Sequence, residues 1–137
     1  MTKRLLLVGT VVLAAVCGTP TSPCACEPQR THLVVYGLVQ TATGAPVAGA
    51  KVFAAVAPEG TADVDPVVAA GDAVATTDAS GKYRVRVLSL FSPTAPADVR
   101  VAVIRAPADT IRAAAVGASL RRVDQAPDSL ALNVVVP

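Results

Sequence analysis

The stretch TDASGKYRVRV, residues 77–87, decides the fold. From Lys82 onward apolar and basic residues alternate, so Tyr83, Val85 and Val87 would share one face of an extended strand. Before that strand, Asp78 can bond its own backbone and Gly81 can adopt a positive φ, as a hairpin with a bulge requires. The stretch therefore predicts a tight turn that leads into a half-buried β-strand.

Short runs rich in Val, separated by turn signals, fill the chain on both sides of this stretch. The expected strands are 33–40, 50–57, 73–77, 82–88, 99–105 and 130–136, with one more at 111–116 or 119–123. The Ala-rich segment 108–120 also permits a short helix. Each half-buried sheet needs a second sheet to cover its apolar face, so the pattern predicts an all-β fold, a single antiparallel β-sandwich of about seven strands.

The N-terminus has the layout of a secretory signal peptide. Lys3 and Arg4 precede an apolar run over residues 5–17, and small or turn-forming residues follow. The run is shorter than the roughly 20 residues that a spanning helix needs. We expect a signal peptide at 1–18, a linker rich in Pro and Cys at 19–30, and one exported domain at 31–137. The expected location is extracytoplasmic, either secreted or periplasmic.

A lipoprotein is the alternative outcome of processing. Leu13-Ala14-Ala15-Val16-Cys17 resembles a bacterial lipobox, although Val16 stands where a smaller residue is usual. In that case the signal would be 1–16, Cys17 would carry the lipid, and the domain would be anchored to the membrane. A lipid on Cys17 is also the only membrane contact that the sequence predicts.

Composition argues against several function classes. Lys3 and Arg4 are two of the 12 basic residues, so the remaining ten balance the 10 acidic residues and leave no basic excess for nucleic-acid binding. His32 is the only imidazole, and no Ser lies in a Gly-x-Ser-x-Gly setting. We therefore expect neither an enzyme nor a resident cofactor.

Cys24, Cys26 and His32 form the most reactive constellation in the chain. Exported cysteines normally oxidise, so a disulfide between Cys24 and Cys26 is one interpretation, and other thiol states, including intermolecular pairing, are a second. Two thiolates and an imidazole could also bind zinc or Cu(I), which makes the three residues candidate metal ligands.

Three further segments are weaker candidates for binding. Asp63 and Asp65 in the loop 58–71, with Asp72 at its edge, supply only a fragment of a calcium site, so a solvated loop is the preferred interpretation. The pair Arg121-Arg122 is interpreted as a solvated strand edge or turn. The strand 130–136 could recruit a partner by strand addition, or its edge could be covered internally.

Two linked motifs resemble carboxypeptidase regulatory-like domains, which are similar to transthyretin and to the B-type repeats of collagen adhesins. The first is Gly37-Leu38-Val39 followed by the segment Gly44 to Val52, and the second is the segment Thr77 to Val85. The resemblance implies an Ig-like or prealbumin-like β-sandwich that is usually non-catalytic. It also implies a structural role for the motif residues Gly37, Val39, Gly44, Pro46, Gly49, Ala50, Val52, Thr77, Asp78, Gly81, Tyr83 and Val85.

The sequence thus predicts a non-catalytic exported β-sandwich that acts as a structural or protein-interaction module at the bacterial cell envelope. Its expected partner is an unidentified protein or cell-surface component, not nucleic acid. The alternative is a metal-binding or thiol-redox accessory protein that uses Cys24, Cys26 and His32.

Overall fold

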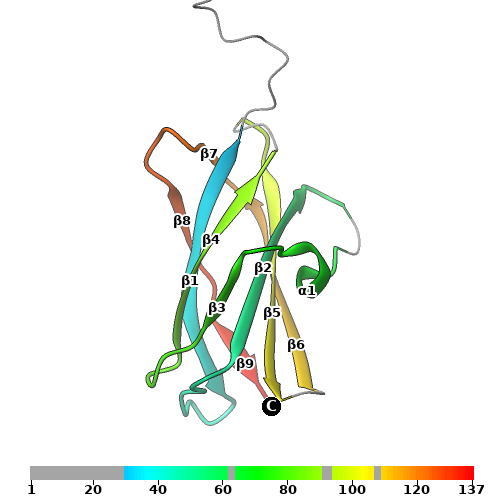
Figure 1. The fold of residues 1–137 in the computed structure, drawn as a ribbon. Helices are drawn as coiled ribbons and strands as arrows, with labels where there is room; N and C mark the ends of the chain where they lie inside the picture. The colour runs from blue at the N-terminus through cyan, green and yellow to red at the C-terminus, as the bar shows by residue number, and fades with distance from the viewer. Residues whose placement is uncertain (1–29, 62–63, 91–93, 107–108) are drawn as a thin grey trace, which may run out of the picture.

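The computed structural model describes residues 30–61, 64–90, 94–106 and 109–137, which form nine strands and one short helix (Figure 1). The leader, the linker except Arg30, Cys17, Cys24, Cys26 and Asp63 lie outside the described residues. The elements are β1 (Thr31–Thr41), β2 (Lys51–Pro58), α1 (Pro66–Ala69), β3 (Val74–Thr76), β4 (Lys82–Ser89), β5 (Ala97–Ala106), β6 (Asp109–Ala118), β7 (Arg121–Arg122), β8 (Asp128–Ala131) and β9 (Val134–Val136).

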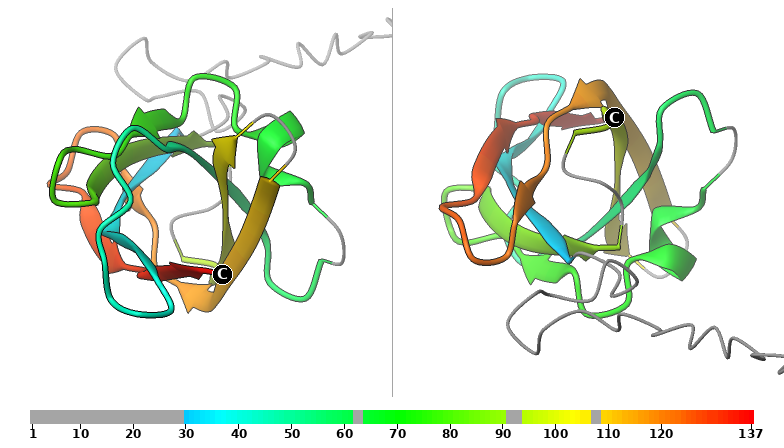
Figure 2. Two further views of the ribbon diagram at one scale, coloured as in Figure 1. Left: turned by 90° about the horizontal axis from the view of Figure 1, so that it is seen from below. Right: turned by 90° about the horizontal axis from the view of Figure 1, so that it is seen from above.

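Two sheets pack face to face, so the all-β sandwich is confirmed (Figure 2). In the first sheet β4 pairs with one edge of β1, while β7, β8 and β9 share the other edge. The second sheet has the order β3-β2-β5-β6. All ladders are antiparallel except those of β8 and β9 with β1, which are parallel because the chain reverses after β7 and then follows β1.

The core consists largely of valines from the inward faces of both sheets. Tyr83, Val85 and Val87 are buried, and the basic residues between them are exposed, as the alternation predicted. On the opposite sheet Val99, Val101 and Val103 are fully buried. Together these side chains form one cluster between the layers.

The helix alternative for residues 108–120 is wrong over the part that the structure describes. Residues 109–118 form β6, which pairs with β5 along its length. Pairing lets Ile111 and Ala113 pack against the core, whereas a helix there would leave the edge of β5 without a partner. Both alternative strand positions are used, since β6 covers 111–116 and β7 lies within 119–123.

The predicted last strand, 130–136, is divided into β8 and β9 at Leu132 and Asn133. The hydroxyl of Tyr83 donates to the Leu132 carbonyl oxygen at 2.5 Å, and the Leu38 amide donates to Asn133 Oδ1 at 2.9 Å. Gly37 on β1 lies against the point of division, where an added Cβ would collide with the Leu132 carbonyl. This division, together with β7, raises the described strand segments to nine.

The two glycine-rich motifs meet at the lower end of the sandwich. Thr77 is buried; its hydroxyl donates to the Val47 carbonyl oxygen at 2.7 Å and accepts from the Ala50 amide at 2.9 Å. Gly81 has a φ of +74° and lies against the Val39 carbonyl, where a Cβ would not fit. Asp78 Oδ1 accepts from the Ser80 and Lys82 amides. These bonds tie β1, β2 and β4 together at one end.

The described parts of segment 58–71, residues 58–61 and 64–71, contact the outer face of the second sheet, although most of these residues are exposed. Asp65 caps α1 by accepting from the Val67 amide at 3.0 Å, and its other oxygen pairs with Arg112 on β6 at 3.0 Å. Arg100 donates to the Thr61 carbonyl oxygen at 2.7 Å. Asp72 is exposed at the end of the segment. No helix in the described part of the chain is long and apolar enough to cross a membrane.

Candidate functional site

The most prominent hollow surface lies where the two sheets approach each other at the edges of β6 and β8. We call it the seam groove and define it by two adjoining hollows that share Ser119, Arg121 and Asp128. Figure 2 places β6 and β9 next to each other on this side of the sandwich. The groove is therefore bordered by one strand of each sheet.

The lower hollow has an apolar floor and a volume of about 400 Å³. Leu33 and Ala118 belong to the buried core, and Leu130 is partly buried against it. Gly117, which has a φ of +68°, also lines the hollow. A small aliphatic side chain matches this surface in size and polarity.

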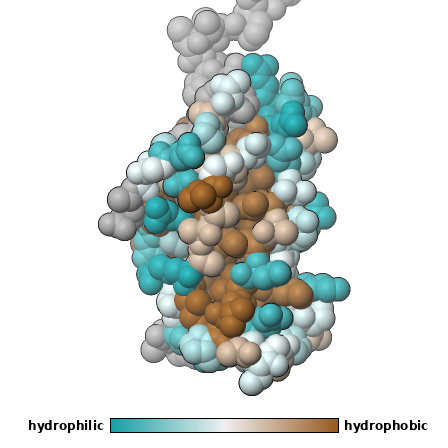
Figure 3. All heavy atoms as spheres, turned by 180° about the vertical axis from the view of Figure 1, so that it is seen from behind, coloured by the Kyte–Doolittle hydropathy of each residue, from teal (hydrophilic) through white to brown (hydrophobic). Residues whose placement is uncertain are grey.

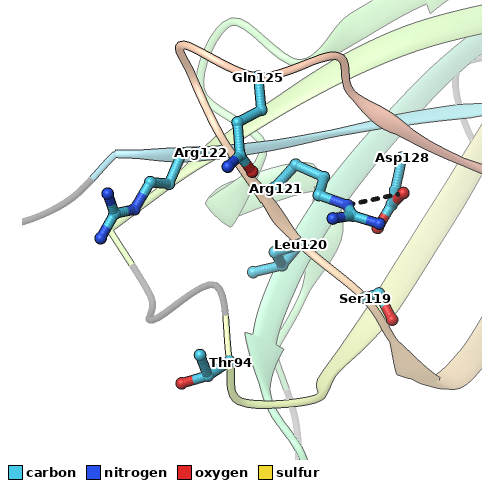
Figure 4. A pocket seen from close by; sticks show the side chains of 7 residues that line it. All are labelled: Thr94, Ser119, Leu120, Arg121, Arg122, Gln125 and Asp128. Atoms are coloured by element: carbon cyan, nitrogen blue, oxygen red, sulfur yellow. Dashed lines mark hydrogen bonds and ion pairs between the residues drawn. The ribbon is translucent and has the colours of Figure 1, made fainter.

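The upper hollow is more polar and measures about 370 Å³ (Figure 4). It is lined by Thr94, Ser119, Leu120, Arg121, Arg122, Gln125 and Asp128. Leu120 is buried at its base, while the side chains of Arg121 and Arg122 point to different sides, as Figure 4 shows. The hollow thus combines an apolar base with two guanidinium groups.

Local chain geometry positions these groups. After β6 the chain crosses from the second sheet to the first through Ser119 and Leu120, and the burial of Leu120 fixes that crossing. Arg121 and Arg122 then pair with the start of β1, and the Val123 amide donates to the Arg30 carbonyl oxygen at 3.1 Å. The Gln125 amide donates to the Arg122 carbonyl oxygen, which closes the turn toward β8.

The two arginines differ in their electrostatic state. Arg121 Nε lies 3.1 Å from Asp128 Oδ1, and both side chains are partly exposed, so this pair contributes little to stability. Within the described residues Arg122 has no carboxylate partner and is exposed. Its guanidinium is therefore available to a carboxylate from outside the chain.

Both strands that border the groove present unpaired backbone edges. β6 pairs only with β5, and β8 pairs only with β1, among the strands that the structure describes. An open strand edge carries amide and carbonyl groups that can pair with another extended chain. The seam groove therefore offers backbone hydrogen bonds along its sides as well as a shaped floor.

Apolar side chains continue along this side of the molecule. Figure 3 shows a broad hydrophobic stripe on the face opposite the viewer in Figure 1, the side to which Figure 2 assigns β6 and β9. Four apolar residues on this side are partly buried against the core: Ile111 and Ala113 on β6, Leu130 on β8, and Leu132 just after β8. The apolar surface thus extends beyond the lower hollow.

His32, the described member of the Cys24, Cys26 and His32 constellation, lies near the start of β1 and is 1% exposed. Its Nδ1 lies 3.4 Å from Arg86 Nη2, and its Nε2 has no hydrogen-bond partner among the described residues. Burial, and secondarily the Arg86 charge, lowers the pKa of His32 below its usual 6.5. No cluster of three metal-ligating side chains occurs in the described segments.

Sequence reasoning did not single out the seam groove. Arg121 and Arg122 were interpreted only as a solvated edge, and Asp128 was not considered. The signal in the sequence was the pair of adjacent arginines followed by Pro127-Asp128. It does not predict the groove, because the pairing of β7 and β8 with β1 depends on tertiary structure. Leu33 and Leu130 meet only because β8 runs parallel to β1.

Comparison with known proteins identifies no family for this chain. No family model matches the chain, and no curated protein matches it. Among solved structures, a chlorocatechol 1,2-dioxygenase from Pseudomonas putida is similar over 77% of this chain and 60% of that one, with 17% sequence identity and a TM-score of 0.49. The chain thus spans less than two thirds of the length of that structure.

Proposed function

We propose that the protein is a non-catalytic, exported interaction module of the bacterial cell envelope that binds an extended segment of a partner protein in the seam groove. The observation that carries this proposal is the pair of unpaired strand edges, on β6 and β8, that flank a groove with an apolar floor. Strand addition of this kind uses backbone hydrogen bonds for affinity and side-chain pockets for selectivity.

The two hollows predict the chemistry of the bound segment. In an extended chain every second side chain points to the same face, so small aliphatic residues in alternate positions would reach the apolar floor. A carboxylate at the upper end of the segment would meet Arg122, whose guanidinium has no carboxylate partner among the described residues. The preferred segment is therefore an alternating Val or Ala strand that ends in an acidic group.

Peptide titration tests the proposal directly. The probe is a hexapeptide that alternates Thr and Val, carries an N-terminal fluorescein and ends in a free carboxylate, and its C-terminal amide is the comparison peptide. Binding is measured by fluorescence anisotropy on the chain without residues 1–18. All nine described strands lie within 31–136, so the sandwich keeps every ladder in this form.

Ser119→Trp is the decisive variant, because Ser119 is exposed and lines both hollows. The indole would fill the groove and should weaken peptide binding by at least about tenfold, or roughly 1.4 kcal/mol. Ala79→Trp, in the exposed turn before β4, is the matched control and should bind the peptide like the parent. Equal affinity of the Ser119 variant and the parent, or no saturable binding by the parent, would refute the proposal.

A further inference from the structure

A third hollow lies at the upper rim of the first sheet, on the side of β1 that pairs with β4. Arg30, Leu88, Ser89 and Leu90 line it, and its volume is about 290 Å³. Leu88 and Leu90 are 62% and 64% exposed, which is unusual for two large apolar side chains so close together. We refer to Arg30, Leu88 and Leu90 with their basic neighbours Arg86 and Arg122 as the upper rim.

The basic residues of the upper rim lie near one end of the first sheet but on both of its faces. Thr31 pairs with Ser89 on one side and with Arg122 on the other, so Arg30 and Arg122 lie at the same end of the sheet, and Arg122 is on the face opposite to Arg86 and Leu88. Arg86 is exposed on the same face of β4 as Leu88, two residues away. Arg30, Arg86 and Arg122 have no carboxylate partner within the described segments.

The acidic residues that the structure describes around the rim, Asp124 and Asp128, do not neutralise this cluster. Asp128 is already paired with Arg121, and Asp124 lies in the exposed turn after β7. Counted with Arg121, the four described arginines exceed these two carboxylates. Exposed leucines and excess positive charge at one end of the sheet are a combination that is typical of surfaces that bind the interface of an anionic bilayer.

We propose that the upper rim docks onto a bilayer that contains anionic phospholipids. Arg30 and Arg122 bind headgroup phosphates, and Leu88 and Leu90 enter the boundary between headgroups and acyl chains. Both kinds of contact strengthen each other, because a headgroup held at Arg30 places its glycerol region beside the leucines that share its hollow.

The position of the remaining chain favours a membrane over a soluble polyanion. Residues 1–29 join the domain at Arg30, inside the upper rim itself. In the alternative lipoprotein form, the lipid on Cys17 would be linked to the domain at this end. A soluble acidic polymer would use the arginines but would gain nothing from the exposed leucines. In that form the rim contact would be a second membrane attachment.

Vesicle cosedimentation tests the rim without the leader or a lipid. The chain without residues 1–18 is mixed with vesicles of phosphatidylcholine alone or with added phosphatidylglycerol, and the bound fraction is measured at low and physiological salt. Binding to the anionic vesicles should exceed binding to the neutral ones by about tenfold, because the negative surface of the anionic vesicles attracts the arginines. Dextran sulfate beads serve as the soluble polyanion.

Two variants separate charge from apolar insertion. Arg30→Glu and the double change Leu88→Ser with Leu90→Ser should each reduce binding to anionic vesicles at least about fivefold. The controls are Lys51→Glu at the opposite end and Val68→Ser on α1, both exposed, which should leave binding unchanged. Circular dichroism confirms that every variant folds.

The outcomes are decisive for the membrane proposal. If the leucine variant binds vesicles like the parent while Arg30→Glu loses both vesicles and dextran sulfate, the rim binds soluble polyanions and the membrane proposal is overturned. Equal binding of the parent to neutral and anionic vesicles also overturns it. The variant Leu88→Ser with Leu90→Ser lies outside both hollows of the seam groove and should bind the hexapeptide like the parent, so the vesicle and peptide assays separate the two proposals.

Discussion

At the scale of single residues, Thr77 links two turns through one hydroxyl group. It is 4% exposed, and its Oγ1 bonds both the Val47 carbonyl oxygen and the Ala50 amide. Thr77→Val keeps the shape but leaves both backbone groups without a partner, so the free energy of unfolding should fall by about 1–3 kcal/mol. Urea denaturation measures this change. Thr76→Val, one residue earlier and exposed, should change stability little; a similar loss in both variants would contradict the assigned role of the hydroxyl.

His32 makes stability depend on pH. Because burial and Arg86 lower its pKa below 6.5, the unfolded chain binds the proton more readily than the folded protein does. Stability from this group is therefore present above pH 6.5 and is lost as pH falls through that value toward the folded pKa. As the chain has one His, an NMR titration of the imidazole measures the pKa directly. A titration midpoint of His32 above pH 6.5 would disprove this pH dependence. So would a His32→Gln variant that loses stability in acid as much as the parent does.

At the scale of elements, Tyr83 fixes the point at which β8 gives way to β9. Tyr83→Phe removes the hydrogen bond to the Leu132 carbonyl oxygen and should lower the free energy of unfolding by about 1 kcal/mol. Tyr36→Phe is the matched control, because Tyr36 is 44% exposed on the outer face of β1. Burial raises the pKa of Tyr83 to about 12, so the parent should also lose stability as pH rises from 10 toward 12. Absence of that alkaline loss, or equal effects of the two substitutions, would argue against this role.

Elements with regular alternation could be predicted from the sequence, and elements defined by distant partners could not. The alternation over residues 82–88 specifies β4 because its period matches one buried face. Residues 109–118 are rich in Ala, whose helix propensity competes with the strand, and only pairing with β5 decides the outcome. The seam groove could not be predicted at all, since its floor joins Leu33, Ala118 and Leu130 through the parallel placement of β8.

At the scale of the whole molecule, hydrogen exchange should distinguish the closed parts of the sandwich from the open seam. Amides of β1, β2 and β5, each paired on both edges, should exchange slowest. Backbone amides of β6 that point away from β5 should exchange fast in the free protein and become protected when the alternating hexapeptide binds. Mass spectrometry of peptic fragments measures both. Protection confined to α1, or none on β6, would contradict strand addition at this edge.

The pairing of β1 with the last strands of the chain determines when folding can finish. The hydrogen bond from Leu38 to Asn133 spans 95 residues, and β9 completes the edge of β1 with the final valines. During synthesis from the N-terminus, β1 therefore stays half-paired until β8 and β9 have been made, and such long-range pairing is slow. Until then the open edge of β1 is free to pair with other extended segments. The same feature makes C-terminal truncation more damaging than the small size of β9 suggests.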